Sequence, residues 1–496
     1  MRFRSIMLGG TGSDVGKSVL AAGLCRILLQ DGYNPAPFKA QNMALNSYVT
    51  PDGLEIGRAQ AVQAEAAGVE CMAEMNPVLL KPSGERTSQV VLNGKPVGNR
   101  DAYEYFRMEN KESLRKEVHA AFDRLQSRYN PIVMEGAGSI AEINLRESDI
   151  VNMSMAKYAD AAVILVADID RGGVFASAYG SIMLQPEEDR KRIKGIIINK
   201  FRGDEKLFER GRKQMEEICG VPVVGIVPYL TDIHIEEEDS VSLMKKSVKH
   251  TDENLINVAV VALPHLSNFT DFDTLSRDPR VHLYFTSDPE ELKKAEIIIL
   301  PGSKNTVSDL RVMMENGCAQ TVTDAAQRGV TVIGICGGYQ MMGTAVDDPD
   351  GVEGEPGSQI GLVLLSARTS LKGEKKVRRV KFTMDCCDGV CEGYEVHNGE
   401  TTVEADAIQP IRREDGSHDG CRAGDNIFGS YVHGLLDNIQ VIDAVLRPYA
   451  IKRGLPETGN IESYREYKER QYNELADRLR KYLDIDKLYE IMRKDD

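Results

Sequence analysis

Short runs of apolar, largely β-branched residues alternate along the chain with segments whose apolar residues recur at helical spacing. Strands buried on both faces of a parallel sheet read as continuous apolar runs, and crossover helices separate them. The pattern therefore predicts an α/β protein with two doubly wound parallel-sheet domains. The runs that carry this prediction lie at 132–134, 161–167, 195–198, 256–263, 297–300 and 331–335.

A polar stretch without periodicity separates the two series of strands. The acidic run 236–239 and the polar residues 245–254 lie there, and a new strand series begins at Ile256. Near the end of the chain, 463–492 is highly charged, with leucines at helical spacing. We expect the C-terminal helices to pack on the second domain. The predicted division is a first domain over 1–240, a linker over 241–254, a second domain over 255–449 and a helical extension over 450–496.

Composition indicates a multi-domain enzyme of the cytoplasm. A chain of 496 residues is too long for one core. No apolar run approaches the ~18 residues of a membrane span, and no signal peptide is recognisable, so we expect no membrane partner. Nine cysteines, an odd count without a disulfide-framework spacing, fit a reducing compartment. A net charge of −15 argues against nucleic-acid binding, and a homo-oligomer is compatible with the sequence.

Cys336 ends one predicted strand in a glycine turn, within the segment 331–340 (TVIGICGGYQ). Such a strand aims the thiol at the carboxyl edge of the sheet, and the glycines tolerate unusual dihedral angles. An isolated cysteine in this setting is more often a small buried hydrophobe. Two other strand ends favour an acyl-transfer site instead: a glycine turn at Ser303 whose amides can hold an oxyanion, and a histidine at position 433.

In order and spacing, these three segments resemble the class I glutamine amidotransferases, which have a flavodoxin-like fold. The resemblance implies that Cys336 attacks the side-chain amide of L-glutamine and that His433 handles the protons. It also implies that the amides near Ser303 and Gly337 bind the oxyanion. The family usually has a glutamate two places after the histidine, where this chain has Leu435. The residue that orients His433 is therefore missing or lies elsewhere, although a Cys-His dyad can still work.

A second glycine-rich turn, 9–18 (GGTGSDVGKS), stands between the first strand and the first helix. Successive backbone amides and a helix N-terminus can surround a phosphate chain, to which a lysine adds charge, while a serine hydroxyl can hold Mg²⁺. A purely structural turn is the weaker interpretation. The segment thus predicts an ATP site made of Gly10, Gly12, Ser13, Asp14, Val15, Gly16, Lys17 and Ser18.

This loop is one residue longer than the usual motif and resembles the dethiobiotin-synthetase-like branch of P-loop proteins, whose members phosphorylate carboxyl or carbamate groups. Glu135 and Asp168 both end apolar strands, and either can be a further Mg²⁺ ligand. The resemblance places Glu135 on the Mg²⁺ ligand of that branch and Asn199 on its adenine-reading position. For Asp168 and Asp170, a role as helix cap or turn former stays open.

The segments 38–50 and 141–152, together with 300–306 and 431–436, closely resemble the cobyric acid synthase family of cobalamin biosynthesis. The resemblance covers nearly the whole chain. It implies amidation of the b, d, e and g carboxylates of adenosylcobyrinic acid a,c-diamide, through an acyl phosphate and ammonia from glutamine. A corrinoid edge presents carboxylates and amides, which need both donors and acceptors. Residues of these types, each of which can instead be a turn or cap residue, are Lys39, Gln41, Asn42, Asn46, Arg146 and Asp149.

Two rival functions stay open at this point. One is a related two-domain amidotransferase that acts on other carboxylates, such as a cobyrinic acid a,c-diamide synthase. The other is a non-enzymatic P-loop switch with a degenerate amidotransferase module, against which the retention of Cys336, His433 and the oxyanion turn argues.

Overall fold

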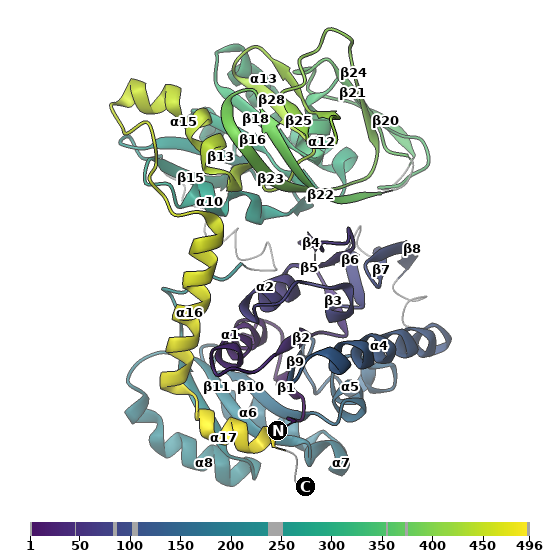
Figure 1. The fold of residues 1–496 in the computed structure, drawn as a ribbon, viewed down its shortest axis with the longest axis vertical. Coiled ribbons are helices and arrows are strands. Elements are labelled where there is room, and N and C mark those ends of the chain that lie inside the picture. Colours follow the sequence, from purple (N-terminus) through teal and green to yellow (C-terminus); the bar gives the residue numbers. More distant parts are fainter. Residues whose placement is uncertain are drawn as a thin grey trace.

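The structure is a computed structural model that describes residues 2–44, 46–82, 87–101, 108–236, 251–353, 356–372 and 375–493. Two six-stranded sheets form the centres of two bodies, which we call the first and second domains (Figure 1). The fold class predicted from the apolar runs is confirmed. The predicted linker lies mostly outside the described residues, and the domain boundaries stay a prediction.

The first domain is built on an entirely parallel sheet with the strand order β12-β11-β10-β1-β9-β2. Helices α1, α16 and α17 pack on one face, and α4, α5, α6 and α8 on the other. The strands are β1 (Ile6–Gly10), β2 (Ala36–Phe38), β9 (Ile132–Glu135), β10 (Ala162–Asp168), β11 (Ile193–Phe201) and β12 (Val223–Pro228). The helices are α1 (Lys17–Gln30), α2 (Arg58–Ala66), α4 (Met108–Arg128), α5 (Met153–Tyr158), α6 (Val174–Met183), α7 (Glu187–Arg190) and α8 (Glu209–Cys219).

The second domain has the sheet order β15-β13-β16-β18-β28-β27, with only β27 antiparallel. The strands are β13 (Ile256–Val261), β15 (Val281–Thr286), β16 (Ile297–Leu300), β18 (Thr331–Ile335), β27 (Cys421–Ala423) and β28 (Ile427–Ser430). The helices are α10 (Asp273–Ser276), α11 (Pro289–Leu292), α12 (Thr306–Glu315), α13 (Cys318–Gln327), α14 (Gly337–Met342) and α15 (Ile439–Arg453).

Strand register gathers the candidate residues at the carboxyl edges of the two sheets. In the first domain Leu8 pairs with Glu135, and Asp168 pairs with Asn199. In the second, Ile335 pairs with Ser430, so that Cys336 and the segment leading to His433 leave the sheet together. Ligand sites of open parallel sheets form at this edge.

Smaller sheets and 3-10 turns complete both domains, and β4 of the first domain lies against β22 and β23 of the second. The first domain adds β3 (Gln41–Met43), β4 (Ser47–Val49), β5 (Glu55–Gly57), β6 (Val78–Pro82), β7 (Thr87–Leu92), β8 (Lys95–Asp101), η1 (Ala73–Met75), η2 (Ile143–Ser148) and η3 (Glu205–Phe208). The second adds β14 (Leu266–Ser267), β17 (Gly302–Ser303), β19 (Ala345–Asp348), β20 (Gly357–Ile360), β21 (Ala367–Ser370), β22 (Lys376–Met384), β23 (Cys387–His397), β24 (Glu400–Val403), β25 (Ile411–Arg413), β26 (His418–Asp419), η4 (Phe269–Phe272) and η5 (Leu435–Asp437). No helix among the described residues is long and apolar enough to cross a membrane.

The C-terminal helices α16 (Tyr464–Tyr482) and α17 (Ile485–Met492) return to the first domain (Figure 1). The expectation that they pack on the second domain is wrong. Leu475 and Leu479 join the apolar cluster of α1, and a Cβ atom on Gly23 would lie 2.1 Å from Leu479 Cδ1. Glycine therefore permits the close approach of α1 and α16. The chain thus returns from the second domain to the first through α16.

We expect Leu479→Ala to lower the free energy of unfolding of the first domain by about 2–4 kcal/mol, because it leaves a cavity between α16 and α1. The measurement is chemical denaturation followed by circular dichroism. Asp477→Ala, at an exposed position of the same helix, serves as the control and should change stability by less than about 0.5 kcal/mol. Equal effects of the two substitutions would contradict the packing of α16 on α1.

Candidate active sites

Cys336 occupies a strained turn between β18 and α14. Its φ of 53° and ψ of −106° lie outside the regions that most residues adopt, and its side chain is buried. A Cβ atom on Gly338 would lie 2.0 Å from the carbonyl oxygen of Leu300, so the turn requires glycine there. Gly337 lies directly against the backbone nitrogen of Ser303. The predicted nucleophile and both predicted oxyanion residues therefore lie together.

His433 is fully buried, and its ring is held by an aspartate from a distant part of the chain. Nδ1 of His433 lies 2.7 Å from Oδ2 of Asp271, while Oδ1 of Asp271 accepts the backbone N–H of Gly434 at 3.0 Å. Asp271 belongs to η4, and Leu435 is buried in the core. The group that orients His433 is therefore present, but on another element than the usual glutamate, and sequence reasoning missed it.

The environment of His433 favours its protonated ring. Burial lowers its pKa, but the interactions with Asp271 and Cys336 outweigh burial and raise the pKa to about 10. The ring of Tyr394 stacks on that of His433 with centroids 5.2 Å apart. A buried cysteine and an imidazolium held by a carboxylate form the pair that thiol nucleophiles require.

A cavity beside Cys336 has walls from both domains. Its floor includes Gln340, whose Nε2 donates to Asn398 O and to the Tyr431 hydroxyl at 3.1 Å each. Lining residues from the first domain are Lys81, Pro82 and Gln89, and those from the second are Ser303, Lys304, Cys336, Gln340, Val352, Glu353, Lys375, Val396, His397 and Asn398.

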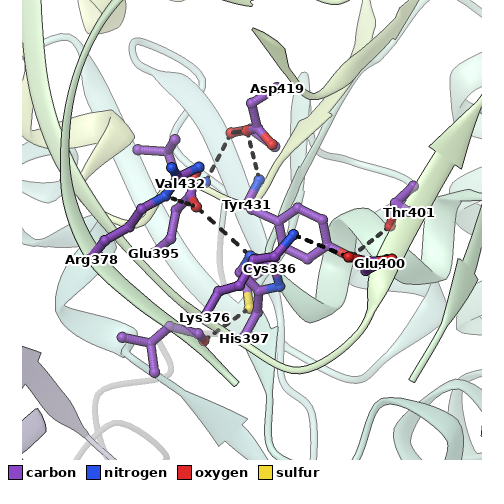
Figure 2. A network of polar contacts seen from close by, with 12 residues as sticks. Cys336, Lys376, Arg378, Glu395, His397, Glu400, Thr401, Asp419, Tyr431 and Val432 are labelled. Atoms are coloured by element: carbon purple, nitrogen blue, oxygen red, sulfur yellow. Dashed lines mark hydrogen bonds and ion pairs between the residues drawn. The ribbon is translucent and has the colours of Figure 1, made fainter. Parts of the chain in front are cut away.

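An ion network supports the wall behind Cys336 (Figure 2). The ring of His397 stacks on that of Tyr431 with centroids 3.7 Å apart, and Nε2 of His397 lies 3.9 Å from Oε2 of Glu395. Burial raises the pKa of Glu395, but His397, Arg378 and Arg413 together lower it to about 2. The carboxylate therefore stays charged and fixes the position of His397 next to the cavity.

In the first domain, the predicted phosphate loop joins β1 to α1. The ammonium of Lys17 donates to the carbonyl oxygens of Gly12 and Gly138 at 2.9 Å each. Burial, opposed by Glu135, lowers the pKa of Lys17 to about 8. Nδ2 of Asn199 donates to Val15 O at 2.8 Å, so this amide lies against the loop. Its predicted contact with adenine stays a prediction.

Glu135 is the acid that lies next to Ser18. The Ser18 hydroxyl donates to Oε1 of Glu135 at 2.8 Å, as does the Lys39 ammonium, and Gln63 donates to Oε2 at 2.6 Å. Burial raises the pKa of Glu135, but Lys39 and the hydrogen bonds outweigh burial and lower it. A serine hydroxyl and a charged carboxylate are ligands that suit Mg²⁺. Gln63 is a further residue of this site that sequence reasoning missed.

The other two acids serve turn and ion-pair contacts. Oδ1 of Asp168 accepts the backbone N–H of Asp170, its Oδ2 pairs with Lys200 at 3.1 Å, and Asp170 pairs with Arg202. Lys200 also donates to the carbonyl oxygen of Asp14. These contacts favour the interpretation of Asp168 and Asp170 as turn formers.

The residues predicted to bind a corrinoid fall into two groups. Lys39, Gln41, Asn42 and Asn46 follow β2, where Lys39 reaches Glu135 and Asn42 donates to Gln60 at 2.9 Å. Arg146 lies in η2 and donates to Leu184 O at 2.6 Å. Asp149 accepts three backbone N–H groups at the start of α5, from residues 151, 152 and 154, as a cap does. Their role toward substrate stays a prediction.

Comparison with known proteins agrees with this arrangement. Residues 6–243 match the family model of the CobQ/CobB/MinD/ParA nucleotide binding domain, and residues 257–441 match that of the CobB/CobQ-like glutamine amidotransferase domain. Proteins named cobyric acid synthase from Phocaeicola vulgatus and Bacteroides fragilis are each 62% identical over 493 residues, which cover 99% of both chains. One from Salmonella arizonae is 47% identical over 99% of both chains.

The chain belongs to the cobyric acid synthase family. The resemblance drawn from the segments around Lys39, Arg146, Ser303 and His433 is thereby confirmed. Cys336 and the predicted phosphate loop lie in different domains, and the cavity at Cys336 lies where those domains meet.

We expect Asp271→Asn to lower the pKa of His433, because the variant loses the carboxylate that stabilises the imidazolium. With a folded-state pKa of about 10 and an ordinary value of 6.5, this ion pair stabilises the fold fully below about pH 6.5 and loses its effect as pH rises through 10. The difference in thermal midpoint between parent and variant should therefore be largest near pH 6 and shrink toward pH 10.

The control is Asp288→Asn, which changes an exposed helix cap of α11 in the same domain. The difference in thermal midpoint between this variant and the parent should not vary over this pH range. A pH-independent difference for Asp271→Asn would show that Asp271 does not set the charge of His433.

Proposed function

We propose that this protein catalyses ATP- and glutamine-dependent amidation of the b, d, e and g carboxylates of adenosylcobyrinic acid a,c-diamide to give cobyric acid. The observation that carries the proposal is the pairing of two sites in one chain. One is the Cys336, His433 and Asp271 set, beside a cavity with walls from both domains, and the other is the phosphate loop with Glu135. The names of relatives 62% identical over 99% of the chain support the product.

In the glutaminase half, Sγ of Cys336 attacks the amide carbon of L-glutamine, and the thiol proton passes to His433. The amides at Ser303 and Gly337 hold the oxyanion. When the tetrahedral intermediate collapses, the C–N bond breaks and ammonia leaves with a proton from His433. Water then hydrolyses the thioester to glutamate. Asp271 holds the ring through Nδ1, so Nε2 is the nitrogen that makes these transfers.

In the synthetase half, an oxygen of the corrinoid carboxylate attacks the γ-phosphorus of ATP, and ADP leaves. The amides of the loop and Lys17 position the phosphates. Ser18 and Glu135 would hold Mg²⁺, which supplies charge neutralisation at the phosphates when bound. Ammonia then attacks the acyl carbon and phosphate leaves. Lys39, at 2.8 Å from Glu135, adds positive charge to this side of the site.

We expect Cys336→Ala to abolish amidation with glutamine and to leave amidation with ammonium salts, because only the thioester step needs the thiol. Lys17→Ala is the matched variant of the other site. It should lower the rate of amidation a hundredfold or more with glutamine and with ammonium salts alike, because carboxylate activation is lost. Product masses and released glutamate and phosphate are the readouts. Glutamine hydrolysis by Cys336→Ala at the parent rate would exclude this nucleophile.

Activation of the carboxylate as an acyl phosphate predicts the fate of its oxygen. With ¹⁸O in the substrate carboxylates, one label should appear in inorganic phosphate for each amide formed, as mass spectrometry of the phosphate can measure. A cobyrinic acid substrate with free a and c carboxylates tests the rival diamide synthase function in the same assay. Unlabelled phosphate beside normal amide formation would contradict the acyl phosphate.

A further inference from the structure

Two side chains of opposite charge face the cavity at Cys336 without an ion-pair partner. Lys304 directly follows the oxyanion residue Ser303, and Glu353 lies in the turn after β19. Within the described part of the chain, neither Lys304 nor Glu353 forms an ion pair, and the two do not pair with each other. The cavity therefore offers one cation and one carboxylate to a bound molecule.

The other two lysines that line this cavity are already paired. Lys81 and Lys375 share the carboxylate of Glu55, which lies 2.6 Å from the Lys375 ammonium. The side chains of Lys81 and Lys375 are only 1% and 4% exposed. Both lysines thus serve the contact between the domains. Lys304 is the lysine of the cavity that is left for a ligand.

The turn that carries Glu353 is fixed by hydrogen bonds. Buried Asp348 accepts the backbone N–H groups of Val352 at 2.7 Å and of Glu353 at 2.9 Å. Oε2 of Glu353 accepts the backbone N–H of Thr306, at the start of α12, at 2.6 Å. Desolvation raises the pKa of Glu353 to about 7, against the hydrogen bonds from Thr306 and the charge of Lys304. A desolvated carboxylate is costly without a cation beside it, and here a ligand can supply one.

The two charges match the backbone end of an amino acid. A phosphate or a metal ion requires side chains of one sign, whereas an α-amino acid carries an ammonium and a carboxylate on the same carbon. Cys336 and Ser303 line the same cavity, at the position proposed for the side-chain amide of glutamine. A glutamine that reaches Cys336 with this amide therefore has its charged end left to be bound elsewhere in the cavity.

We propose that Glu353 binds the α-ammonium of L-glutamine and that Lys304 binds its α-carboxylate, so that these two residues set the specificity of the glutaminase site. The inference rests on the proposed function, because it takes glutamine as the substrate of Cys336. Both side chains gain an ion-pair partner when glutamine binds. Molecules with the same side-chain amide but without one of the two charges are then poor substrates.

Two glutamine analogues, each without one of these charges, test the assignment. Glutaramate lacks the α-ammonium, and γ-aminobutyramide lacks the α-carboxylate, while both keep the amide. The readout is kcat/KM for ammonia release. The parent should use glutamine about tenfold better than either analogue, or more, because each analogue leaves one charged group of the protein unpaired. Equal kcat/KM for glutamine and both analogues would overturn the proposal.

Two variants should show a crossed pattern with the three substrates. Glu353→Gln keeps an acceptor for the Thr306 N–H but has no charge, so it should lower kcat/KM about tenfold with glutamine and γ-aminobutyramide, and not with glutaramate. Lys304→Met should lower it with glutamine and glutaramate, and not with γ-aminobutyramide. A merely structural role would lower all three values alike, and that result would contradict the assignment.

The matched controls are Glu315→Gln in α12 and Lys452→Met in α15, which remove the same charges at exposed positions of the second domain. Both should equal the parent with all three substrates. A parent with the expected preferences that does not amidate the corrinoid would overturn the proposed function of the synthetase half and support the roles of Glu353 and Lys304. Amidation of the corrinoid beside equal use of the three amides would do the reverse.

The pH dependence of the parent tests Glu353 even where a variant fails to fold. The ratio of kcat/KM for glutamine to that for glutaramate cancels the titration of Cys336 and His433, which act on both substrates. The charged groups that face Glu353 are Lys304, before α12, and Asp348, at the end of β19. Only an ionised Glu353 pairs with the ammonium, so with a pKa of about 7 the ratio should rise about tenfold from pH 6 to pH 8. A constant ratio would overturn the role of Glu353.

Discussion

The ion pair between His433 and Asp271 is the interaction on which the amidotransferase site depends. Both groups are buried, and a buried charge is costly unless a partner and hydrogen bonds satisfy it. Asp271 meets both conditions, because one oxygen binds the ring and the other the backbone of Gly434. The pair therefore joins the η4 turn to the segment after β28 and fixes the ring relative to Cys336.

Buried ion pairs also join the two domains. Glu55 of the first domain is completely buried and pairs with Lys81 of its own domain and with Lys375 of the second, the latter at 2.6 Å. Separation of the domains would leave these groups with fewer partners. Burial raises the pKa of Glu55, but the two lysines outweigh burial and lower it. Lys81 and Lys375 also line the cavity at Cys336, so this cavity exists only while the domains touch.

Sequence patterns predicted those site residues whose position depends on the strand directly before them. Cys336 and Ser303 both follow apolar strands, and parallel strands place such residues at one edge without further information. Asp271 is 162 residues from His433, in a short buried turn with no strand or helix period, so no spacing connects the two. The helical spacing of Leu475 and Leu479 identified an apolar face but did not identify the sheet that the face covers. The glycine at position 23 that admits α16 is indistinguishable in sequence from any other helical glycine.

The carboxylate that orients His433 comes from Asp271 and not from position 435, two residues after the histidine, where this chain has a leucine. A glutamate two residues after the histidine would stand in the same segment as the ring, whereas Asp271 stands in a turn that also carries Asn268. That turn meets β4 of the first domain through Ser47. The carboxylate that orients His433 and a contact with the first domain therefore share one short turn.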